Sequence, residues 1–175
     1  MLTRNMIVTE CDAPEALIVN IPDSQLSGSG FAGDHVQSYL IYHYSRSRLH
    51  TQQNDDGNGG RAAWTADERT VGEYIQADFG QLQRIQAIAT QGMADASHRV
   101  KSYKFAYSTD GVTYHYVTSD DDGSDRVFGG NSDRNTVIEH SFDESIVARF
   151  VRLYPQTYVA YMALRWEVYG CSYIG

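Results

Sequence analysis

Three short stretches of the chain combine residue types that bind ligands. The first, residues 31–44, mixes aromatic and polar side chains, and its candidate ligand-binding residues are Asp34, His35, Val36, Tyr39, Leu40 and Tyr42. Aromatic rings can stack on a sugar or fill a protein pocket while their hydroxyl groups form hydrogen bonds with the ligand. The alternative is that Leu40, Ile41 and some of the tyrosines pack against the core.

The second stretch offers oxygen donors for a metal ion. Residues 54–60 read Asn-Asp-Asp-Gly-Asn-Gly-Gly and place Asp56 and Asn58 on a flexible backbone. Hard oxygen ligands of this kind suit Ca²⁺, although the spacing is not that of an EF-hand loop. An acidic turn is the alternative, because Asp-Gly and Asn-Gly favour turns for conformational reasons alone.

The third stretch, residues 93–99, contains the candidate binding residues Met93, Asp95, His98 and Arg99. The imidazole and guanidinium groups can donate hydrogen bonds to sugar hydroxyls or to a carboxylate. Solvated side chains at the end of a loop are the alternative. The acidic run from Asp120 to Asp122 is predicted to be a solvated turn without a function.

The two cysteines lie at opposite ends of the sequence. Cys11 and Cys171 are 160 residues apart, and neither belongs to a Cys-x-x-Cys pair of the kind that binds zinc. They can form a disulfide if the ends of the domain meet, and the alternative is two unrelated buried thiols. A disulfide would indicate an extracellular or secretory compartment.

Short strands must position these stretches. In residues 74–79, apolar side chains at Ile75, Ala77 and Phe79 alternate with polar ones, which is the pattern of a strand with one buried face. Strand-like stretches recur at residues 84–91, 100–108, 113–118, 136–142, 148–154 and 163–169. No stretch keeps the apolar spacing of an amphipathic helix. Seven short strands with tight turns predict one all-β antiparallel sandwich or barrel.

The connections between these strands differ in length. Asp110-Gly111 predicts a hairpin between two of them. Residues 25–61 form a much longer polar segment rich in Gly, Ser, Asp and Asn, and interrupted by aromatic residues. Long connections of this kind usually carry functional loops.

Composition and charge exclude some classes of function. The 175 residues fit one domain, with 42% hydrophobic and 21% charged residues and a net charge of -8. With only two lysines, the chain lacks the basic surface that nucleic acid requires, and an anionic membrane would not attract it at long range. Residues 1–10 are predicted to be an N-terminal extension without the apolar stretch of a signal peptide, and no apolar run is long enough to cross a membrane.

The sequence lacks the motifs of common enzymes. It contains no Gly-x-Ser-x-Gly nucleophile elbow, no His-Glu-x-x-His zinc helix and no glycine-rich phosphate loop followed by a helix. The carboxylates of Asp78, Asp110 and Glu167 are explained by turns and strand faces. We therefore predict that the protein is not an enzyme and has no catalytic residues.

A series of motifs extends from Cys11 to Cys171. They include Ile-Pro-Asp-Ser-Gln-Leu at residues 21–26, Ala-Trp at 63–64, Tyr-Ile-Gln-Ala-Asp-Phe-Gly at 74–80, Tyr-Ser-Thr-Asp-Gly at 107–111 and Ala-Leu-Arg-Trp-Glu-Val-Tyr-Gly-Cys at 163–171. In this order the motifs resemble the discoidin family, also described as coagulation factor V/VIII C-type domains. The resemblance covers residues 11–171 and leaves residues 172–175 as a tail.

The resemblance implies a fold and a class of function. The fold is a distorted jelly-roll β-sandwich of the galactose-binding type, with loops projecting from one end and its ends tied by the first and last cysteines. The function is that of a binding module without catalytic activity, which recognises glycans, phospholipid headgroups or extracellular proteins. In the glycan-binding branch, an Asp-Gly-Asn loop forms a calcium site with a glutamate of the last strand, which corresponds here to Glu167.

The expected function is therefore a secreted or extracellular module for adhesion or lectin-like recognition. Its ligand would be a glycan or an extracellular protein, with Ca²⁺ as a possible cofactor bound by Asp56, Asn58 and Glu167. The alternative is peripheral binding to a phospholipid membrane, with the apolar loop tips Val36, Leu40 and Met93 entering the interface. The loops between residues 27 and 60 differ most from the blood-clotting branch of the family, so the resemblance does not identify the ligand.

Overall fold

Strands dominate the computed structural model, which describes residues 11–33, 42–55, 57 and 59–175. The described part contains no α-helix and three short 3-10 helices, η1 (Ile18–Asn20), η2 (Asp23–Gln25) and η3 (Tyr44–Ser47). No helix in these residues is long and apolar enough to span a membrane. The strands are β1 (Glu15–Ala16), β2 (Leu26–Gly28), β3 (Trp64–Thr65), β4 (Ile75–Gln91), β5 (Arg99–Ser108), β6 (His115–Tyr116), β7 (Val127–Gly129), β8 (Ile138–Val159) and β9 (Ala163–Ser172).

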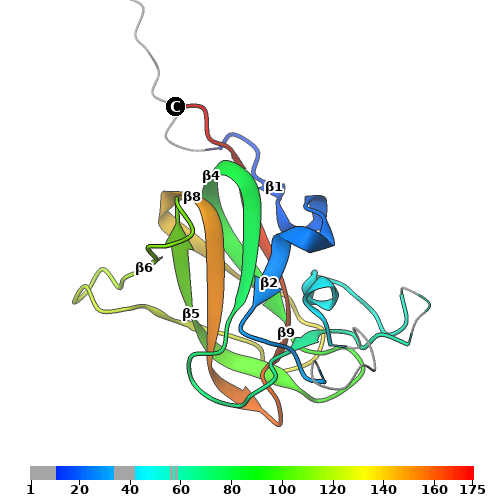
Figure 1. Ribbon diagram of the computed structural model, residues 1–175. Helices are drawn as coiled ribbons and strands as arrows, with labels where there is room; N and C mark the ends of the chain where they lie inside the picture. The colour runs from blue at the N-terminus through cyan, green and yellow to red at the C-terminus, as the bar shows by residue number, and fades with distance from the viewer. Residues whose placement is uncertain (1–10, 34–41, 56, 58) are drawn as a thin grey trace, which may run out of the picture.

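Two long strands carry the chain from one layer of the sandwich to the other. The strand order is β1-β9-β4-β8-β5-β6, and all the paired strands are antiparallel. The first part of β4 pairs with β2, whereas its second part pairs with β9. Because β4 and β8 both bend where their register shifts, one sheet folds back over itself, as Figure 1 shows. The predicted all-β, distorted jelly-roll sandwich is confirmed.

The bend in β4 has a local cause. Gly80 adopts a φ of +74°, which side chains other than glycine rarely tolerate, and its N–H donates to Asp78 Oδ1 at 2.7 Å. Arg149 of β8 donates from both Nε and Nη2 to the same carboxylate, at 2.7 and 2.9 Å. This pairing lowers the pKa of Asp78, so the carboxylate stays ionised and holds the two bending strands together.

The core lies between the two layers. Ile75, Ala77 and Phe79 are buried while their neighbours in β4 are half-buried, as the alternating pattern predicts. Trp64 and Trp166 are fully buried, and each indole N–H has an acceptor. Trp64 donates to the Gly30 carbonyl at 3.0 Å and Trp166 donates to Ser47 Oγ at 3.1 Å. The two indoles therefore anchor the long polar segment to the core.

The two ends of the domain meet at one pole of the sandwich, where Figure 1 marks the C-terminus. Cys11 and Cys171 form a disulfide with their Cα atoms 5.9 Å apart, so the predicted bond is confirmed and the alternative of two free thiols is wrong. Pairing of β1 with β9 brings Glu15 opposite Gly170 beside this bond.

Candidate ligand-binding site

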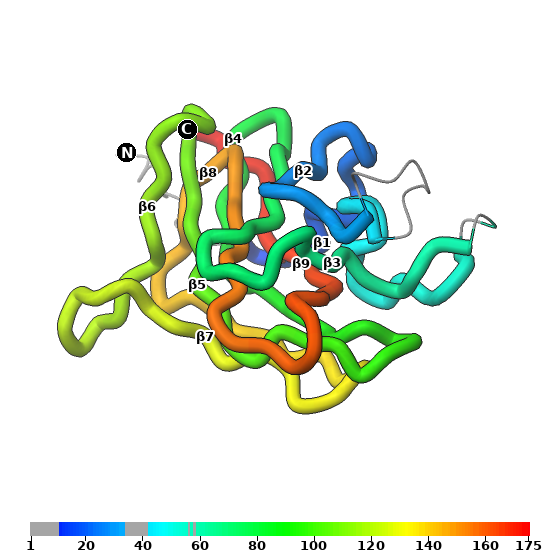
Figure 2. Tube along the Cα trace, turned by 60° about the horizontal axis from the view of Figure 1, so that its bottom comes forward, coloured from blue at the N-terminus to red at the C-terminus, as the bar shows by residue number. Residues whose placement is uncertain are grey.

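The pole opposite the disulfide gathers four turns that are distant in sequence. Strand pairing brings Gln91 beside Arg165, and Arg99 beside Val159, so the ends of β4 and β8 and the starts of β5 and β9 lie together. Figure 2 views this pole and shows the turns at residues 66–74, 92–98, 131–136 and 159–162 side by side. We refer to this pole as the loop end.

A buried arginine holds two of the loop-end turns and the segment at Thr51 together. Arg165 is fully buried, and its Nε donates to the Gly92 carbonyl at 2.8 Å. Its Nη1 donates to the Thr51 carbonyl at 2.9 Å, and its Nη2 donates to the Arg134 carbonyl at 2.7 Å and to Asn135 Oδ1 at 2.9 Å. Burial lowers the pKa of Arg165 to about 10, which leaves it charged at neutral pH.

A second buried arginine organises the segment before β3. Arg46 is 5% exposed, and its Nε donates to the Arg61 carbonyl at 2.7 Å. Its Nη2 donates to the carbonyls of Gln52 and Gly60. The two ends of the glycine-rich loop at residues 54–60 are therefore held in place by a single guanidinium group.

Five side chains meet on the surface of the loop end. We name them the loop-end cluster: Arg61, Arg69, Asp95, His98 and Tyr161. Arg61 Nε lies 2.7 Å from Asp95 Oδ2, and Asp95 Oδ1 accepts a hydrogen bond from the Ala62 N–H at 3.2 Å. The His98 and Tyr161 rings have centroids 4.7 Å apart, and the Arg69 guanidinium lies 3.9 Å from the Tyr161 centroid. The cluster thus combines aromatic faces, a carboxylate and two guanidinium groups.

Several polar atoms in and beside this cluster have unused hydrogen-bonding capacity. Within the described residues, Arg61 Nε, Asp95 Oδ2, His98 Nδ1 and Arg99 Nε are buried without a hydrogen bond of good geometry. Arg61 Nε and Asp95 Oδ2 nevertheless form an ion pair with each other at 2.7 Å, so of these four atoms His98 Nδ1 and Arg99 Nε are the ones without a partner. A buried polar atom left without a partner costs about 1–3 kcal/mol, so such atoms rarely gather in one place without a function.

The environment of His98 lowers its pKa. Burial is the largest cause, and the positive charge of Arg61 adds to it. The imidazole is therefore neutral at pH 7, with one nitrogen that donates a hydrogen bond and one that accepts. A neutral ring of this kind suits a ligand hydroxyl, which can both donate and accept.

Acidification should remove a small stabilising contribution that depends on His98. Because its folded pKa lies below the unfolded value of about 6.5, the unfolded chain binds the proton first. The contribution is present above pH 6.5 and is lost as the pH falls through 6.5 towards the folded pKa. Between pH 7 and pH 5, we expect the free energy of unfolding of His98→Gln, measured with urea, to fall less than that of the wild type. The difference between the two should be below about 1 kcal/mol. His115→Gln, at an exposed histidine, is the control, and identical pH profiles for wild type and His98→Gln would contradict this assignment.

The structure brings some of the predicted binding residues together. Asp95 and His98 belong to the loop-end cluster, and Arg99 follows them with its Nη1 donating to the Ser97 carbonyl at 2.9 Å. Arg99 also lines an open hollow of about 670 Å³ with residues 132–136. Tyr42 is half-buried, and its ring packs against Ala63 and Met93.

Met93 does not occupy the predicted position. Its side chain is fully buried against Ala63 and Ala163, because the turn closes by a hydrogen bond from the Met93 N–H to the His98 carbonyl at 3.0 Å. The prediction that Met93 contacts a ligand or enters a membrane interface is therefore wrong. The predicted residues Asp34, His35, Val36, Tyr39 and Leu40 lie outside the described residues.

The prediction that Glu167 binds calcium is also wrong. It is 2% exposed, and its carboxylate accepts hydrogen bonds from the N–H groups of Ile18, Val19 and Val168 at 2.6, 3.0 and 2.9 Å. Burial raises its pKa, and these three donors occupy both oxygens, so the group caps η1. Asp56 and Asn58 lie outside the described residues, and within the part of the chain that the structure describes no group of three or more His, Cys, Asp or Glu residues is arranged for a metal.

Sequence reasoning missed Arg61, Arg69 and Tyr161. Each follows or lies within a turn whose place in the site depends on pairing between strands distant in sequence, so no local spacing marks them. The only sequence signal for Arg61 is that it directly follows the glycine-rich loop.

Comparison with known proteins fits this fold and this arrangement of loops. The sequence profile of the F5/8 type C domain matches residues 29–168, which is most of the chain. The chain belongs to the discoidin, or F5/8 type C, family. Domains of this family are carbohydrate- or phospholipid-binding modules, without a catalytic role.

Relatives of this discoidin domain are larger proteins. It is 34% identical to lactadherin of Mus musculus over 165 residues, which is 92% of this chain and 34% of lactadherin. It is 31% identical to coagulation factor VIII of Canis lupus familiaris over 154 residues, which is 87% of this chain and 6% of that protein. The chain thus spans about a third, or much less, of these relatives.

Solved structures share the fold. Discoidin II of Dictyostelium discoideum has a TM-score of 0.76 at 24% identity and covers 94% of this chain, while this chain covers 61% of it. The family 32 carbohydrate-binding module of NanJ from C. perfringens, solved in complex with galactose, has a TM-score of 0.61 at 14% identity, with 89% of this chain and 98% of the module covered. At these identities the likeness establishes the fold alone.

Proposed function

We propose that this discoidin domain is an extracellular recognition module that binds a glycan at the loop-end cluster. The observation that carries the proposal is the meeting of the Arg61–Asp95 ion pair with the buried, unpartnered Nδ1 of His98 beside the ring of Tyr161. The Cys11–Cys171 disulfide supports the extracellular assignment, because such bonds persist in oxidising compartments.

The chemistry of the cluster suits a sugar. Adjacent sugar hydroxyls both donate and accept, so one pair can bind Asp95 and Arg61 while another binds the neutral imidazole of His98. The apolar face of a pyranose can stack on Tyr161, whose other neighbours, His98 and Arg69, fix its ring. Structural neighbours were solved with galactose and with GalNAc-β-1,3-galactose, which supports a glycan as the first ligand class to test.

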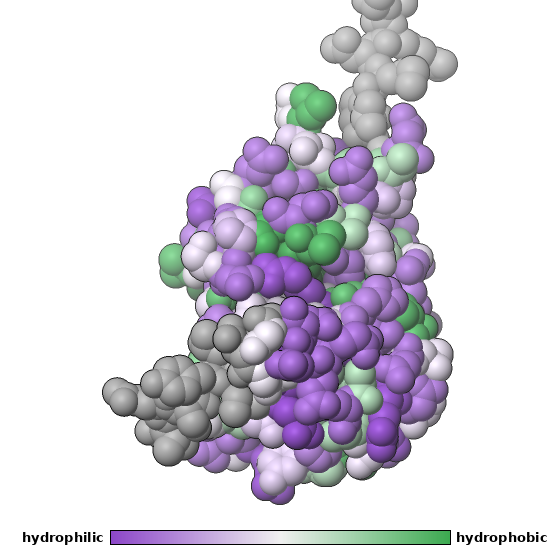
Figure 3. Space-filling view, turned by 90° about the vertical axis from the view of Figure 1, so that its right-hand side faces the viewer, coloured by the Kyte–Doolittle hydropathy of each residue, from purple (hydrophilic) through white to green (hydrophobic). Residues whose placement is uncertain are grey.

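Phospholipid binding is the second candidate function, and the described surface favours it less. At the loop end, the large apolar side chains that are exposed are Val71, at 73%, and Val137, at 37%, and they come from different turns. Figure 3 shows a largely hydrophilic surface over the described residues beside the loop end. The net charge of -8 adds no attraction to anionic lipid. The predicted apolar tips Val36 and Leu40 lie outside the described residues, so they remain the basis of this alternative.

Calcium dependence is a separate part of the proposal. It rests on the predicted donors Asp56 and Asn58, because Glu167 is engaged in capping η1. Oxygen ligands from the adjacent backbone would complete a site in that loop. Binding measured in Ca²⁺ and in chelator tests this part without affecting the rest.

A glycan array and liposome sedimentation, each in Ca²⁺ and in EDTA, are the test. We expect binding to glycans, and we expect Asp95→Asn and Arg61→Met to weaken the strongest glycan at least tenfold, or about 1.4 kcal/mol, because each removes a charged partner of the hydroxyl pairs. Asp125→Asn, which disrupts an ion pair with Lys104 away from the loop end, is the matched control and should leave affinity unchanged. Sedimentation with phospholipid vesicles in the absence of glycan binding would replace this proposal with the membrane alternative.

A further inference from the structure

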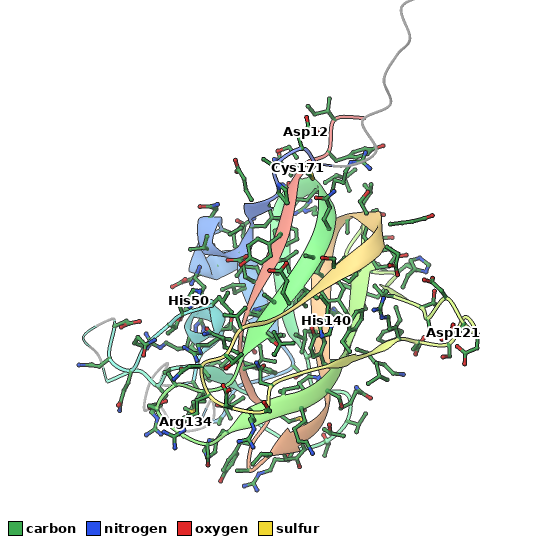
Figure 4. The ribbon with its side chains drawn as sticks, turned by 180° about the vertical axis from the view of Figure 1, so that it is seen from behind. Asp12, His50, Asp121, Arg134, His140 and Cys171 are labelled. Carbon is green, nitrogen blue, oxygen red and sulfur yellow. A yellow bond between two sulfur atoms is a disulfide. The ribbon has the colours of Figure 1, made fainter. Side chains whose placement is uncertain are left out.

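A second hollow lies along the side of the sandwich, away from the loop end. Its volume is about 540 Å³, and we name it the arm pocket after the hairpin that forms one wall, residues 117–126. The arm projects from β6, and Figure 4 shows Asp121 at its tip, on the opposite side of the molecule from His50. The lining residues are Tyr107, Tyr116, Val117, Thr118, Asp120, Arg126, Phe142, Asp143, Glu144, Ser145, Ile146 and Val147.

Backbone hydrogen bonds make the arm an ordered wall. The Val117 N–H donates to the Phe105 carbonyl at 2.9 Å, and the Arg126 N–H donates to the Val117 carbonyl at 2.8 Å. Thr118 bridges to Asp125, and the Ser119 N–H donates to the Ser124 carbonyl at 2.8 Å. Asp120 is therefore presented on a closed hairpin, which keeps its position relative to β5.

The facing wall is a bulge of β8. Strand pairing runs from Ser141 opposite Ala87 directly to Ile146 opposite Ile85, so the four residues between them leave the ladder. Arg84 Nη1 donates to Ser145 Oγ at 3.1 Å and holds the bulge in place. Bulges commonly redirect side chains towards functional sites, and this one places Asp143 and Glu144 in the lining of the pocket.

Apolar and aromatic side chains form the floor of the arm pocket. Tyr107, Val117, Phe142 and Ile146 are half-buried and pack against the main core, so the floor continues the core outwards. The Phe142 ring stacks on Phe105 at 5.4 Å between centroids. Partly exposed rings on a rigid support are suited to hold a flat or apolar group.

The rim of the arm pocket carries excess negative charge. Arg126 is the basic residue of the lining, and it lies 3.5 Å from Asp143 and 4.7 Å from the Phe128 ring. Asp120 and Glu144 have no ion-pair partner among the described residues, and they stand on opposite walls. Two unpaired carboxylates above an aromatic floor are complementary to a cation that has apolar faces.

We propose that the arm pocket binds an arginine side chain of a basic segment in a partner protein. A guanidinium is planar and weakly hydrated on its faces, so it can stack on Tyr107 or Phe142 while its edges donate to Asp120 and Glu144. The same sheet already contains this kind of contact, since the guanidinium of Arg152 lies 4.2 Å from the Tyr74 centroid and 3.7 Å from the Tyr114 centroid.

A basic protein segment fits the surroundings better than a single small cation. The arm continues past the pocket through the exposed carboxylates of Asp121 and Asp122, which can attract further basic residues of the same segment. A choline headgroup or an amino sugar would use the pocket but not this extension. The protein's net charge of -8 also favours a basic partner.

Binding of a synthetic peptide tests the proposal. The probe is a fluorescently labelled peptide with three arginines separated by glycines, and a lysine peptide of the same length is the comparison. With the complete chain at 150 mM salt, anisotropy should show tighter binding of the arginine peptide. Asp120→Asn and Glu144→Gln should each weaken that binding five- to tenfold. Asp12→Asn is the control, because it removes the same charge from an exposed aspartate outside both the pocket lining and the arm, and it should change affinity less than twofold.

A second variant tests the floor. Tyr107→Leu keeps an apolar side chain but removes one of the two aromatic faces, and we expect it to reduce the preference for arginine over lysine while thermal unfolding shows the fold intact. Asp95→Asn at the loop end should leave peptide binding unchanged, so this proposal can fail without affecting the glycan proposal. An Asp12→Asn effect equal to that of Glu144→Gln would overturn the arm pocket as a site. Binding of phosphatidylcholine vesicles or glucosamine oligomers, but not of the peptide, would overturn the proposed partner.

Discussion

Replacement of Arg165 by methionine should lower the free energy of unfolding by about 3–5 kcal/mol, the effect of removing one partner from a buried charged network. Methionine fills a similar volume, so little of this loss would come from a cavity. It donates no hydrogen bond, however, and would leave the carbonyls of Thr51, Gly92 and Arg134 in a buried position without their donor.

The variant Arg165→Lys distinguishes the contribution of the positive charge to stability from that of the hydrogen-bond geometry. Lysine keeps the positive charge, but its single ammonium group cannot reproduce the fork that reaches Thr51, Gly92 and Arg134 at once. We therefore expect it to recover less than half of the stability lost in Arg165→Met. Urea unfolding of both variants is the measurement, with Arg126→Met as the control at a partly exposed arginine whose ion pair with Asp143 lies on the surface, where the change should stay below about 1 kcal/mol. Wild-type stability in Arg165→Met would contradict the role assigned to this network.

The same network connects stability to recognition. Arg165 touches the segments at residues 51, 92 and 134–135, and the loop-end cluster is carried by the neighbouring turns. A cluster that binds a ligand needs its side chains held in place by supporting residues, and Arg165 supplies this support from below. Under conditions in which Arg165→Lys is folded, this variant should therefore still bind the ligand more weakly than the wild type does.

Sequence periodicity predicted the buried face of the first part of β4, where alternate residues are buried, and it located β9 but not which of its residues are buried. Residues 163–168 are all buried, although the strand contains Arg165 and Glu167. The strand is covered on both sides, by the core and by the segments around η1 and η3, so polar residues there satisfy backbone groups instead of facing water. A single sequence carries no signal for which polar residues have this role. Glu167 was misassigned to calcium for that reason.

Bends in long strands also limited the prediction of where strands begin and end. The two predicted strands at residues 74–79 and 84–91 belong to one strand, β4 (Ile75–Gln91), and those at 136–142 and 148–154 belong to β8, which begins at Ile138. The predicted strand at residues 74–79 stops before Gly80, whereas the positive φ of Gly80 allows the strand to bend and continue in the other layer. The Asp110-Gly111 hairpin was predicted correctly, because local bonds from Ser108 and Asp110 determine it.

Two of the five residues of the loop-end cluster followed from loop composition, and three required the fold. Asp95 and His98 could be predicted because polar residues gather in a short turn after a strand. The burial of Met93 in that same turn depends on its contact with Ala163 of β9, which sequence proximity does not reveal. Tyr161 reaches His98 only through the pairing of β5 with the end of β8.

Reduction of the Cys11–Cys171 bond should have the largest effect on stability. The bond closes a loop of 160 residues, and the chain-entropy relation gives a loss of up to about 5 kcal/mol when a loop of that length is opened in the unfolded state. The native contacts change little, because β1 still pairs with β9 and the cysteines lie at the edge of the fold. We expect reduced protein and Cys11→Ala/Cys171→Ala to show the same large fall in thermal midpoint.

The location of the disulfide also gives an expected result for ligand binding. The bond is at the pole opposite the loop end, whereas ligand binding depends on Arg165 and the turns around it. Below its own thermal midpoint, Cys11→Ala/Cys171→Ala should therefore bind the array-selected glycan and the arginine peptide as tightly as the wild type. A fall in affinity at a temperature where the variant is fully folded would show that the disulfide also shapes the native loops. A thermal midpoint unchanged by reduction would mean that the unfolded chain gains little freedom, and the entropic account would fail.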